Sequence, residues 1–274
     1  MPLKDPESRG TVLRHITVAI MGQEMALKLP KVIGHRGACA YAPENTLDSI
    51  KTAAALGVEW VELDVMLTRD SIPVIFHDDM LDRTSNGFGN MADHDWEYIK
   101  ELDAGAWYGE SFAGAHIPSL EDALDVILEK GLGLNLEIKP TPGRERETAE
   151  VALDVLSRIW DDHSRLLISS FQYTCLEIAQ DMAPDWYRGV LFDHDEEMPE
   201  NWREIVDYLD AATVNIGDKL ATRSLIDEIM DFEKAILVYT INDPQRARTL
   251  QTWGVDAVFS DNPDVILQNL LKVH

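Results

Sequence analysis

Three carboxylates at strand-like positions are the residues of this sequence best suited to holding a metal ion. Glu62 and Asp64 stand two residues apart in an apolar run, and Glu137 stands in a second such run. Alternate residues of a strand share a face, so Glu62 and Asp64 point the same way. Buried carboxylates are costly without a cation, and oxygen ligands suit a hard divalent ion. We therefore predict one Mg²⁺ or Ca²⁺ ion held by all three; the alternative is that each is a solvated rim charge.

Two histidines stand where they would serve the same site. His35 follows the first apolar run, and His77 follows another, with Asp78 directly after it. Imidazole titrates near neutrality, so two of them beside one site can act as a general acid and a general base. We predict that His35 and His77 form this pair, in an order that the sequence does not decide, and that Asp78 orients His77. Either histidine alone would equally well be a hydrogen-bonded structural residue.

An alternation of strands and helices positions these side chains. From Lys31 onward, short β-branched runs alternate with longer amphipathic stretches. The expected strands cover residues 31–34, 59–65, 132–139, 166–171, 187–192, 211–215, 235–241 and 257–260. The expected helices cover residues 46–56, 120–130, 145–160, 173–182, 202–209, 222–232, 244–253 and 264–271. This order predicts an α/β fold, the (β/α)₈ TIM barrel, which usually needs about 250 residues and carries its chemistry at the carboxyl ends of the strands.

One apolar run does not fit as a barrel strand. Residues 73–76 follow the 59–65 strand after a turn at 69–71, which leaves too few residues for a parallel crossover. The run predicts a hairpin that opens an insertion at about residues 67–118 of a barrel spanning 31–274. Within the insertion, Phe88, Trp107 and Tyr108 either line the pocket or fill a local core. Residues 1–30 show no clear period and are expected to be an N-terminal extension outside the active site.

Composition narrows the choice of partners and compartment. Lys and Arg number 24 against 49 Asp and Glu, a formal net charge of −25 that disfavours nucleic acids and anionic membrane surfaces. Two cysteines, Cys39 and Cys175, are too few for a disulfide framework and indicate a reducing compartment. No apolar run approaches the about 20 residues that span a bilayer. We expect a cytoplasmic protein with a small-molecule substrate and no stable membrane association, in an oligomeric state that the sequence leaves open.

A set of short motifs, taken in order, resembles the glycerophosphodiester phosphodiesterase family, in its bacterial cytosolic type. The motifs are Gly34-His35-Arg36-Gly37, Pro43-Glu44-Asn45-Thr46, Glu62-Leu63-Asp64, His77-Asp78, Glu137-Ile138-Lys139, Ser170-Phe171 and Ser260-Asp261-Asn262-Pro263. Each motif is weak alone, but the full order from about Lys31 to the C-terminus is specific. The resemblance implies a TIM barrel with a small insertion after its second strand, a divalent metal at the three carboxylates, and catalysis by the two histidines.

The resemblance also implies roles for residues around this centre. It implies that Arg36 and Lys139 bind the substrate phosphate, that Asn45 lies close to the metal, and that Phe171 and Tyr239 belong to the pocket wall. Tyr239 is a departure, because the family commonly has Trp at this position. The implied reaction is hydrolysis of glycerophosphodiesters to glycerol 3-phosphate and an alcohol through a cyclic phosphate. A lysophospholipase D-like activity on the same site, or a noncatalytic binding module, are the alternatives.

Overall fold

The fold is a closed barrel of parallel strands. The computed structural model describes residues 26–193 and 197–271, and within them eight parallel strands close into a ring, with β1 paired to both β9 and β2. The strands are β1 (Val32–Gly34), β2 (Trp60–Leu67), β4 (Gly133–Ile138), β5 (Leu166–Ser170), β6 (Tyr187–Phe192), β7 (Thr213–Gly217), β8 (Ala235–Tyr239) and β9 (Ala257–Ser260). The predicted TIM-barrel fold is confirmed.

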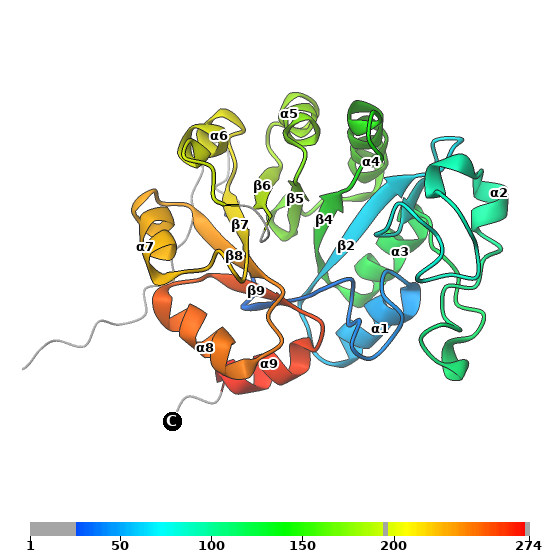
Figure 1. The fold of residues 1–274 in the computed structure, drawn as a ribbon, viewed down its shortest axis with the longest axis horizontal. Helices are drawn as coiled ribbons and strands as arrows, with labels where there is room; N and C mark the ends of the chain where they lie inside the picture. The colour runs from blue at the N-terminus through cyan, green and yellow to red at the C-terminus, as the bar shows by residue number, and fades with distance from the viewer. Residues whose placement is uncertain (1–25, 194–196, 272–274) are drawn as a thin grey trace, which may run out of the picture.

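Helices surround the strands, as Figure 1 shows. They are α1 (Leu47–Ala55), α3 (Leu120–Lys130), α4 (Glu145–Ile159), α5 (Tyr173–Met182), α6 (Trp202–Tyr208), α7 (Arg223–Asp231), α8 (Pro244–Trp253) and α9 (Pro263–Leu271). Local sequence fixes several of their ends. Helix α3, for example, starts at a reciprocal hydrogen-bonded cap between Ser119 and Asp122 and stops at Gly131 in the left-handed conformation.

Alternation along β2 separates the outer core from the barrel interior. Val61, Leu63 and Val65 are fully buried in a cluster shared with α1, α3 and α4. Glu62 and Asp64, which lie between them, line the cavity inside the barrel. The floor of the barrel is closed by an apolar cluster that includes Trp60, Ile33, Leu167, Leu237, Phe259 and Leu27. The strand period therefore puts the carboxylates on the inner face, above an apolar plug.

The predicted hairpin and insertion are present beside β2 (Figure 1). Strand β3 (Pro73–Ile75) runs antiparallel to β2, with Val65 opposite Ile75 and Leu67 opposite Pro73. The chain then forms two 3₁₀ turns (Met91–Asp93 and Glu110–Phe112) and the short helix α2 (Trp96–Ile99) before reaching α3. The insertion has its own apolar cluster, to which Met66 of β2 and Leu81 contribute. It therefore packs on the barrel as a small separate core.

Three strands depart from their expected bounds by two residues. Strand β2 continues to Leu67 rather than ending at 65. Strand β7 starts at Thr213 rather than at 211, because the Ala211 amide donates to the Val206 carbonyl and so belongs to the turn that leaves α6. Strand β8 ends at Tyr239 rather than at 241. Of the predicted N-terminal extension, residues 1–25 lie outside the described residues, while Leu27 packs into the floor of the barrel.

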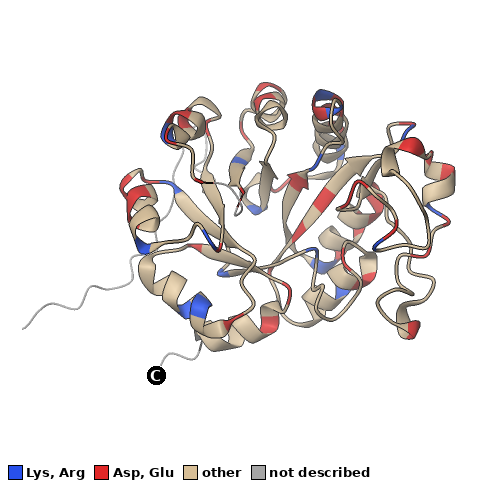
Figure 2. Cartoon of the chain, in the orientation of Figure 1, with Lys and Arg blue, Asp and Glu red and all other residues tan. Residues whose placement is uncertain are grey.

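Acidic side chains are spread over the outer helices and also occur on β2 inside the ring, as Figure 2 shows. Lys and Arg are fewer and more scattered, in line with the formal net charge of −25. In the part of the chain that the structure describes, no helix combines the length and the apolar character that crossing a membrane requires.

Gly133 should be irreplaceable for packing at the floor of the barrel. A Cβ added there would lie 2.3 Å from Cε2 of the buried Trp60 ring, whereas one added to Gly109 would meet no atom closer than 4.0 Å. We predict that Gly133→Ala lowers the free energy of unfolding by about 2 kcal/mol through overpacking. Gly109, whose φ of 176° any residue adopts, supplies the matched control, and Gly109→Ala should leave urea denaturation unchanged. Equal urea midpoints for the two variants would contradict this account.

Candidate active site

A tight turn after β1 presents the first site residues. A Cβ on Gly34 would lie 2.2 Å from the Gly37 carbonyl oxygen, and one on Gly37, whose φ is +87°, would lie 2.7 Å from the Ser49 backbone. Both positions therefore require glycine. The turn brings the Arg36 amide, at a φ of +49°, within 2.9 Å of Glu62 Oε2, to which it donates. The Gly-His-Arg-Gly segment thus fastens the β1 loop to the acidic face of β2.

The three predicted carboxylates come together at the mouth of the barrel. One ligand oxygen from each of Glu62, Asp64 and Glu137 lies within 4.8 Å of the others. Strands β2 and β4 are neighbours, and Asp64 is paired in register with Glu137. Asn45 Nδ2 donates to Asp64 Oδ2 at 2.8 Å, so the amide lies beside the cluster, as the resemblance implied. The geometry allows one ion to contact all three side chains.

The electrostatics of this cluster favour a cation. Burial, followed by the charges of Asp64 and Glu137, raises the pKa of Glu62. Burial and Asp64 likewise raise the pKa of Glu137 to about 8. Although burial opposes it, Arg36 and other cationic neighbours lower the pKa of Asp64. Glu137 Oε1 has no hydrogen-bond partner among the described residues. A divalent ion fits these residues because it would offset their repulsion and give that oxygen a partner.

His35 is oriented by a carboxylate from the far end of the chain. Its Nδ1 lies 2.6 Å from Oδ1 of Asp261, which directly follows β9, and its Nε2 lies 4.0 Å from Glu62 Oε2. Asp261 also accepts hydrogen bonds from Asn242 Nδ2 and Cys39 Sγ. Despite burial, the bond to His35 lowers the pKa of Asp261. An ionised Asp261 holds the proton on Nδ1 and leaves Nε2 directed toward the acidic cluster.

His77 is held in the corresponding way from the insertion. Its Nδ1 lies 2.5 Å from Asp78 Oδ1, and its Nε2 lies 2.6 Å from Lys139 Nζ. An ammonium group only donates, so Nε2 accepts and Nδ1 donates to Asp78, which makes the imidazole neutral. Burial, together with the positive charges of Arg36 and Lys139, lowers the pKa of His77. Asp78 contacts His77 directly, as the sequence predicted.

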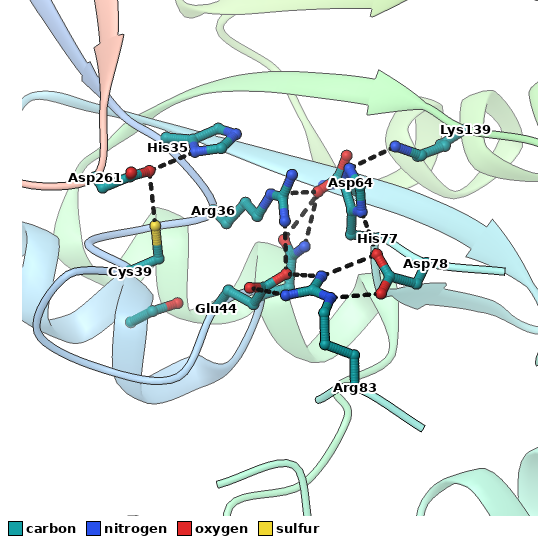
Figure 3. Close-up of polar contacts among 12 residues, drawn as sticks. His35, Arg36, Cys39, Glu44, Asp64, His77, Asp78, Arg83, Lys139 and Asp261 are labelled. Carbon is teal, nitrogen blue, oxygen red and sulfur yellow. Dashed lines mark hydrogen bonds and ion pairs between the residues drawn. The ribbon is translucent and has the colours of Figure 1, made fainter. Parts of the chain in front are cut away.

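An ion-pair network joins the two sides of the site. Glu44 accepts from Arg36 Nη1 at 2.7 Å and from Arg83 Nη1 and Nη2, both at 2.8 Å. Arg83, from the insertion, also donates to both oxygens of Asp78, at 2.5 and 2.9 Å. In Figure 3, His35 with Asp261 lies to one side of Arg36, and His77 with Asp78 to the other. Arg83 therefore links the carboxylate that orients His77 to the one that holds Arg36.

A cavity of about 740 Å³ opens onto these residues. Of the predicted site residues it is lined by His35, Arg36, Glu62, Asp64, His77, Glu137, Lys139, Phe171 and Tyr239. Asn45 and Asp78 stand behind this lining, in contact with Asp64 and His77. Phe171 and Tyr239 meet edge to face with ring centroids 6.0 Å apart, and Tyr239 Oη donates to the Phe192 carbonyl at 2.5 Å. The two rings form an aromatic wall of the cavity, which Asp193, Asp218 and Lys219 line as well.

The aromatic residues of the insertion do not belong to this wall. Phe88, Trp107 and Tyr108 are absent from the described lining of the cavity, and the Phe88 side chain is 74% exposed. The lining instead includes Asn135 and Ser169 from the barrel interior, which the sequence did not single out.

Three carboxylate and guanidinium partners also escaped the sequence analysis. Asp261 and Glu44 lie in segments that carried the resemblance but were given no role, and Arg83 was not singled out. Asp261 could have been predicted from the rule that active-site residues of a TIM barrel follow the ends of strands. It directly follows β9, and β9 is the neighbour of β1. Arg83 had no such signal, because its position depends on how the insertion folds back over the barrel.

A (β/α)₈ barrel with carboxylates, imidazoles and cations around one cavity at the ends of its strands has the architecture of a barrel enzyme acting on a charged substrate. The chain belongs to the glycerophosphoryl diester phosphodiesterase family, whose sequence model matches residues 35–265.

Individual relatives support this assignment over most of their length. A glycerophosphodiester phosphodiesterase of Caldanaerobacter subterraneus is 31% identical over 245 residues, covering 88% of this chain and 97% of the relative. YhdW of Bacillus subtilis is 33% identical over 246 residues, covering 87% and 97%. The solved structure of an Oleispira antarctica phosphodiesterase in complex with its product sn-glycerol-3-phosphate has a TM-score of 0.85 and 41% identity, covering 88% of this chain and 97% of that one.

Removing one carboxylate charge should weaken binding of a divalent ion. We predict that Glu137→Gln lowers the affinity for Mg²⁺ or Ca²⁺ by at least about tenfold, because the amide keeps the shape of the side chain but loses the charge that attracts the cation. Isothermal titration calorimetry measures the effect. Glu150→Gln, on the exposed surface of α4, makes the same change in net charge and should bind like the unaltered protein. Equal affinities for the two variants would rule out Glu137 as a ligand.

Proposed function

We propose that the protein hydrolyses glycerophosphodiesters, such as glycerophosphocholine or glycerophosphoethanolamine, to glycerol 3-phosphate and an alcohol. The observation that carries this proposal is the meeting of three carboxylates between two histidine–aspartate pairs in one cavity. Membership of the family supports the class of reaction. The glycerol 3-phosphate bound to the Oleispira relative supports the product.

A divalent ion, Mg²⁺ or Ca²⁺, is part of the proposal. Glu62, Asp64 and Glu137 would hold it, and it would supply positive charge that stabilises the phosphoryl oxygens as the transition state forms. Asn45 keeps Asp64 oriented toward this centre, and the Arg36 amide does the same for Glu62 Oε2. These contacts preorganise the carboxylates, so that binding does not have to arrange them.

Arg36 and Lys139 are the proposed phosphate ligands. Both line the cavity. The Arg36 guanidinium pairs with Glu44 through Nη1 and lies 3.5 Å from Asp64 Oδ2 through Nε, and Nζ of Lys139 is directed at His77 Nε2 in the same cavity. Cationic donors aimed at a diester anion give charge-assisted hydrogen bonds to its non-bridging oxygens. The aromatic wall of Phe171 and Tyr239 would cover the carbon atoms of the substrate.

The two histidines would manage the protons of a two-step reaction. In the first step the 2-hydroxyl of the glycerol attacks phosphorus, one imidazole takes its proton, and the other protonates the alcohol oxygen as that bond breaks. In the second step water attacks the cyclic phosphate and gives its proton to the imidazole that donated before. The first imidazole then protonates the 2-oxygen as the ring opens, which restores both histidines. Their Nδ1 bonds to Asp261 and Asp78 turn each Nε2 toward the cavity. Lys139 Nζ would have to release His77 Nε2, for example to a substrate oxygen, before this atom takes part in a transfer.

A cytoplasmic location is also proposed. Cys39 and Cys175 are both free thiols in the structure, which supports a reducing compartment.

The function is tested by product release. We predict that the protein converts glycerophosphocholine to glycerol 3-phosphate, and that a chelator stops the reaction until Mg²⁺ or Ca²⁺ is restored. An enzymatic assay for glycerol 3-phosphate measures this. Lysophosphatidylcholine is the comparison substrate, and its cleavage at the same bond would release choline and lysophosphatidic acid. With choline release measured for both substrates, we expect a lower kcat/KM for lysophosphatidylcholine because its acyl chain has to be accommodated as well. No release of glycerol 3-phosphate under any divalent ion would refute the proposal.

The histidine assignment has its own test. We predict that His35→Ala and His77→Ala each lower kcat by about 10²-fold or more, since each removes one positioned proton donor or acceptor. Calorimetry should show that both variants still bind the divalent ion, because all three carboxylates remain. His163→Ala, in the turn before β5 and outside the cavity lining, is the matched control and should keep full activity. Turnover that survives either of the first two substitutions would remove that histidine from the mechanism.

A further inference from the structure

A polar layer lies directly below the carboxylates, inside the barrel. Asn135 of β4 is paired in register with Glu62 of β2, one inward-facing position below Glu137. Ser169 of β5 is the register partner of Glu137. Asn135 and Ser169 are each only 1% exposed, yet both line the cavity. The cavity therefore offers an amide and a hydroxyl below the carboxylates, in addition to apolar lining such as Phe259.

The Asn135 amide is only half satisfied. Its Nδ2 donates to Ser169 Oγ at 2.7 Å, so the amide oxygen is the end turned away from Ser169. Its Oδ1 is buried and has no hydrogen-bond partner among the described residues. Burying a carbonyl oxygen without a hydrogen-bond donor costs folding free energy. This atom can therefore accept a hydrogen bond from an O–H or N–H group of a molecule bound in the cavity.

The space around this acceptor is shaped by neighbouring strands. Gly189 of β6 is the register partner of Ser169, and a Cβ there would lie 2.5 Å from Thr213 Oγ1 and 3.0 Å from Asn215 Nδ2. The side chains of Thr213 and Asn215 therefore lie across β6, over the glycine. Thr213 Oγ1 is bonded to Asn215 Oδ1 at 2.8 Å, and neither residue lines the cavity. They fill the layer next to Ser169, where Asn215 Nδ2 is likewise buried without a hydrogen-bond partner among the described residues, but of the two amides only Asn135 lines the cavity.

We propose that Asn135 Oδ1 accepts a hydrogen bond from the primary hydroxyl of the substrate glycerol, the hydroxyl that does not attack phosphorus. The inference rests on the proposed function. Because the attacking 2-hydroxyl and the leaving alcohol are roughly in line through phosphorus, the glycerol and the head group occupy opposite sides of it. A glycerol whose 2-hydroxyl lies at the carboxylates has its primary hydroxyl one carbon away, at the level of Glu62 and Asn135.

This contact would make Asn135 a specificity residue. A diester whose primary hydroxyl is replaced by hydrogen leaves the buried oxygen unpaired, so the site would reject it. Sites built to bond a substrate hydroxyl discriminate strongly against analogues that lack it, whereas apolar pockets discriminate weakly. The bottom of the cavity would thus select glycerol over other 1,2-diols. The head group of the substrate would lie toward the open end of the cavity.

The experiment compares two substrates that share the attacking hydroxyl. These are glycerophosphocholine and 2-hydroxypropyl phosphocholine, which lacks only the primary hydroxyl. We expect the unaltered enzyme, with its divalent ion, to show a kcat/KM at least about tenfold higher for glycerophosphocholine. In Asn135→Leu, which keeps the size of the side chain, this preference should fall to about twofold or less. The loss should come from glycerophosphocholine, with little change for the analogue.

Thr213→Val is the matched control, since it removes a hydroxyl from the same buried layer without touching the cavity. Thr213→Val should change kcat/KM by the same factor for both substrates, so that the preference for glycerophosphocholine is kept. An unaltered enzyme that treats the two substrates alike, or an Asn135→Leu enzyme that keeps the full preference, would overturn the inference while leaving the proposed function intact. An unaltered enzyme with no activity on glycerophosphocholine would overturn both. The substrate comparison needs no variant, so it stands even where Asn135→Leu fails to fold.

Discussion

The crowding of three carboxylates is the interaction on which the rest of the site depends. Backbone pairing of β2 with β4 places Asp64 opposite Glu137, so the side chains cannot move apart without breaking the barrel. The chain compensates this charge unevenly. Arg36 and Asn45 stabilise Asp64 as an anion, while the pKa values of Glu62 and Glu137 remain raised. The fold therefore brings together carboxylates that repel one another, and binding of the proposed divalent ion would relieve this repulsion and stabilise the barrel mouth.

The two imidazoles reach this centre by different structural routes. Closure of the barrel brings β9 beside β1, and this places Asp261 against His35, although the two residues are 226 positions apart. His77 arrives through the hairpin of β2 and β3, next to its own orienting residue Asp78. One histidine thus depends on global closure and the other on a local turn. Both end with Nδ1 on a carboxylate, so two unrelated routes produce the same hydrogen-bond arrangement at Nδ1.

Periodicity explains what the sequence predicted and what it missed. The two-residue period of β2 was enough to place Glu62 and Asp64 together, and the short spacing before Pro73 was enough to exclude a parallel crossover. Both are local properties of the chain. To predict the role of Asp261, one has to know that the first and last strands become neighbours. To single out Asn135, one has to know that its amide oxygen is buried without a hydrogen-bond donor. Arg83 depends on long-range packing of an irregular segment, for which no spacing rule exists. The bounds of β7 failed by two residues because Ala211 is recruited by the end of α6.

Arg83 makes the insertion and the barrel hard to separate in a chimaera. Its guanidinium holds Glu44 and Asp78 at once, although most of the surrounding segment packs on a core of its own. A graft that exchanged only residues 79–118 for the matching segment of a relative would leave His77, Asp78 and the barrel carboxylates in the recipient chain. It would still release Asp78 from its anchor unless the donor segment carried an arginine at the matching position. The insertion is thus tied to the active site through Arg83 in addition to packing on the barrel through its own apolar cluster.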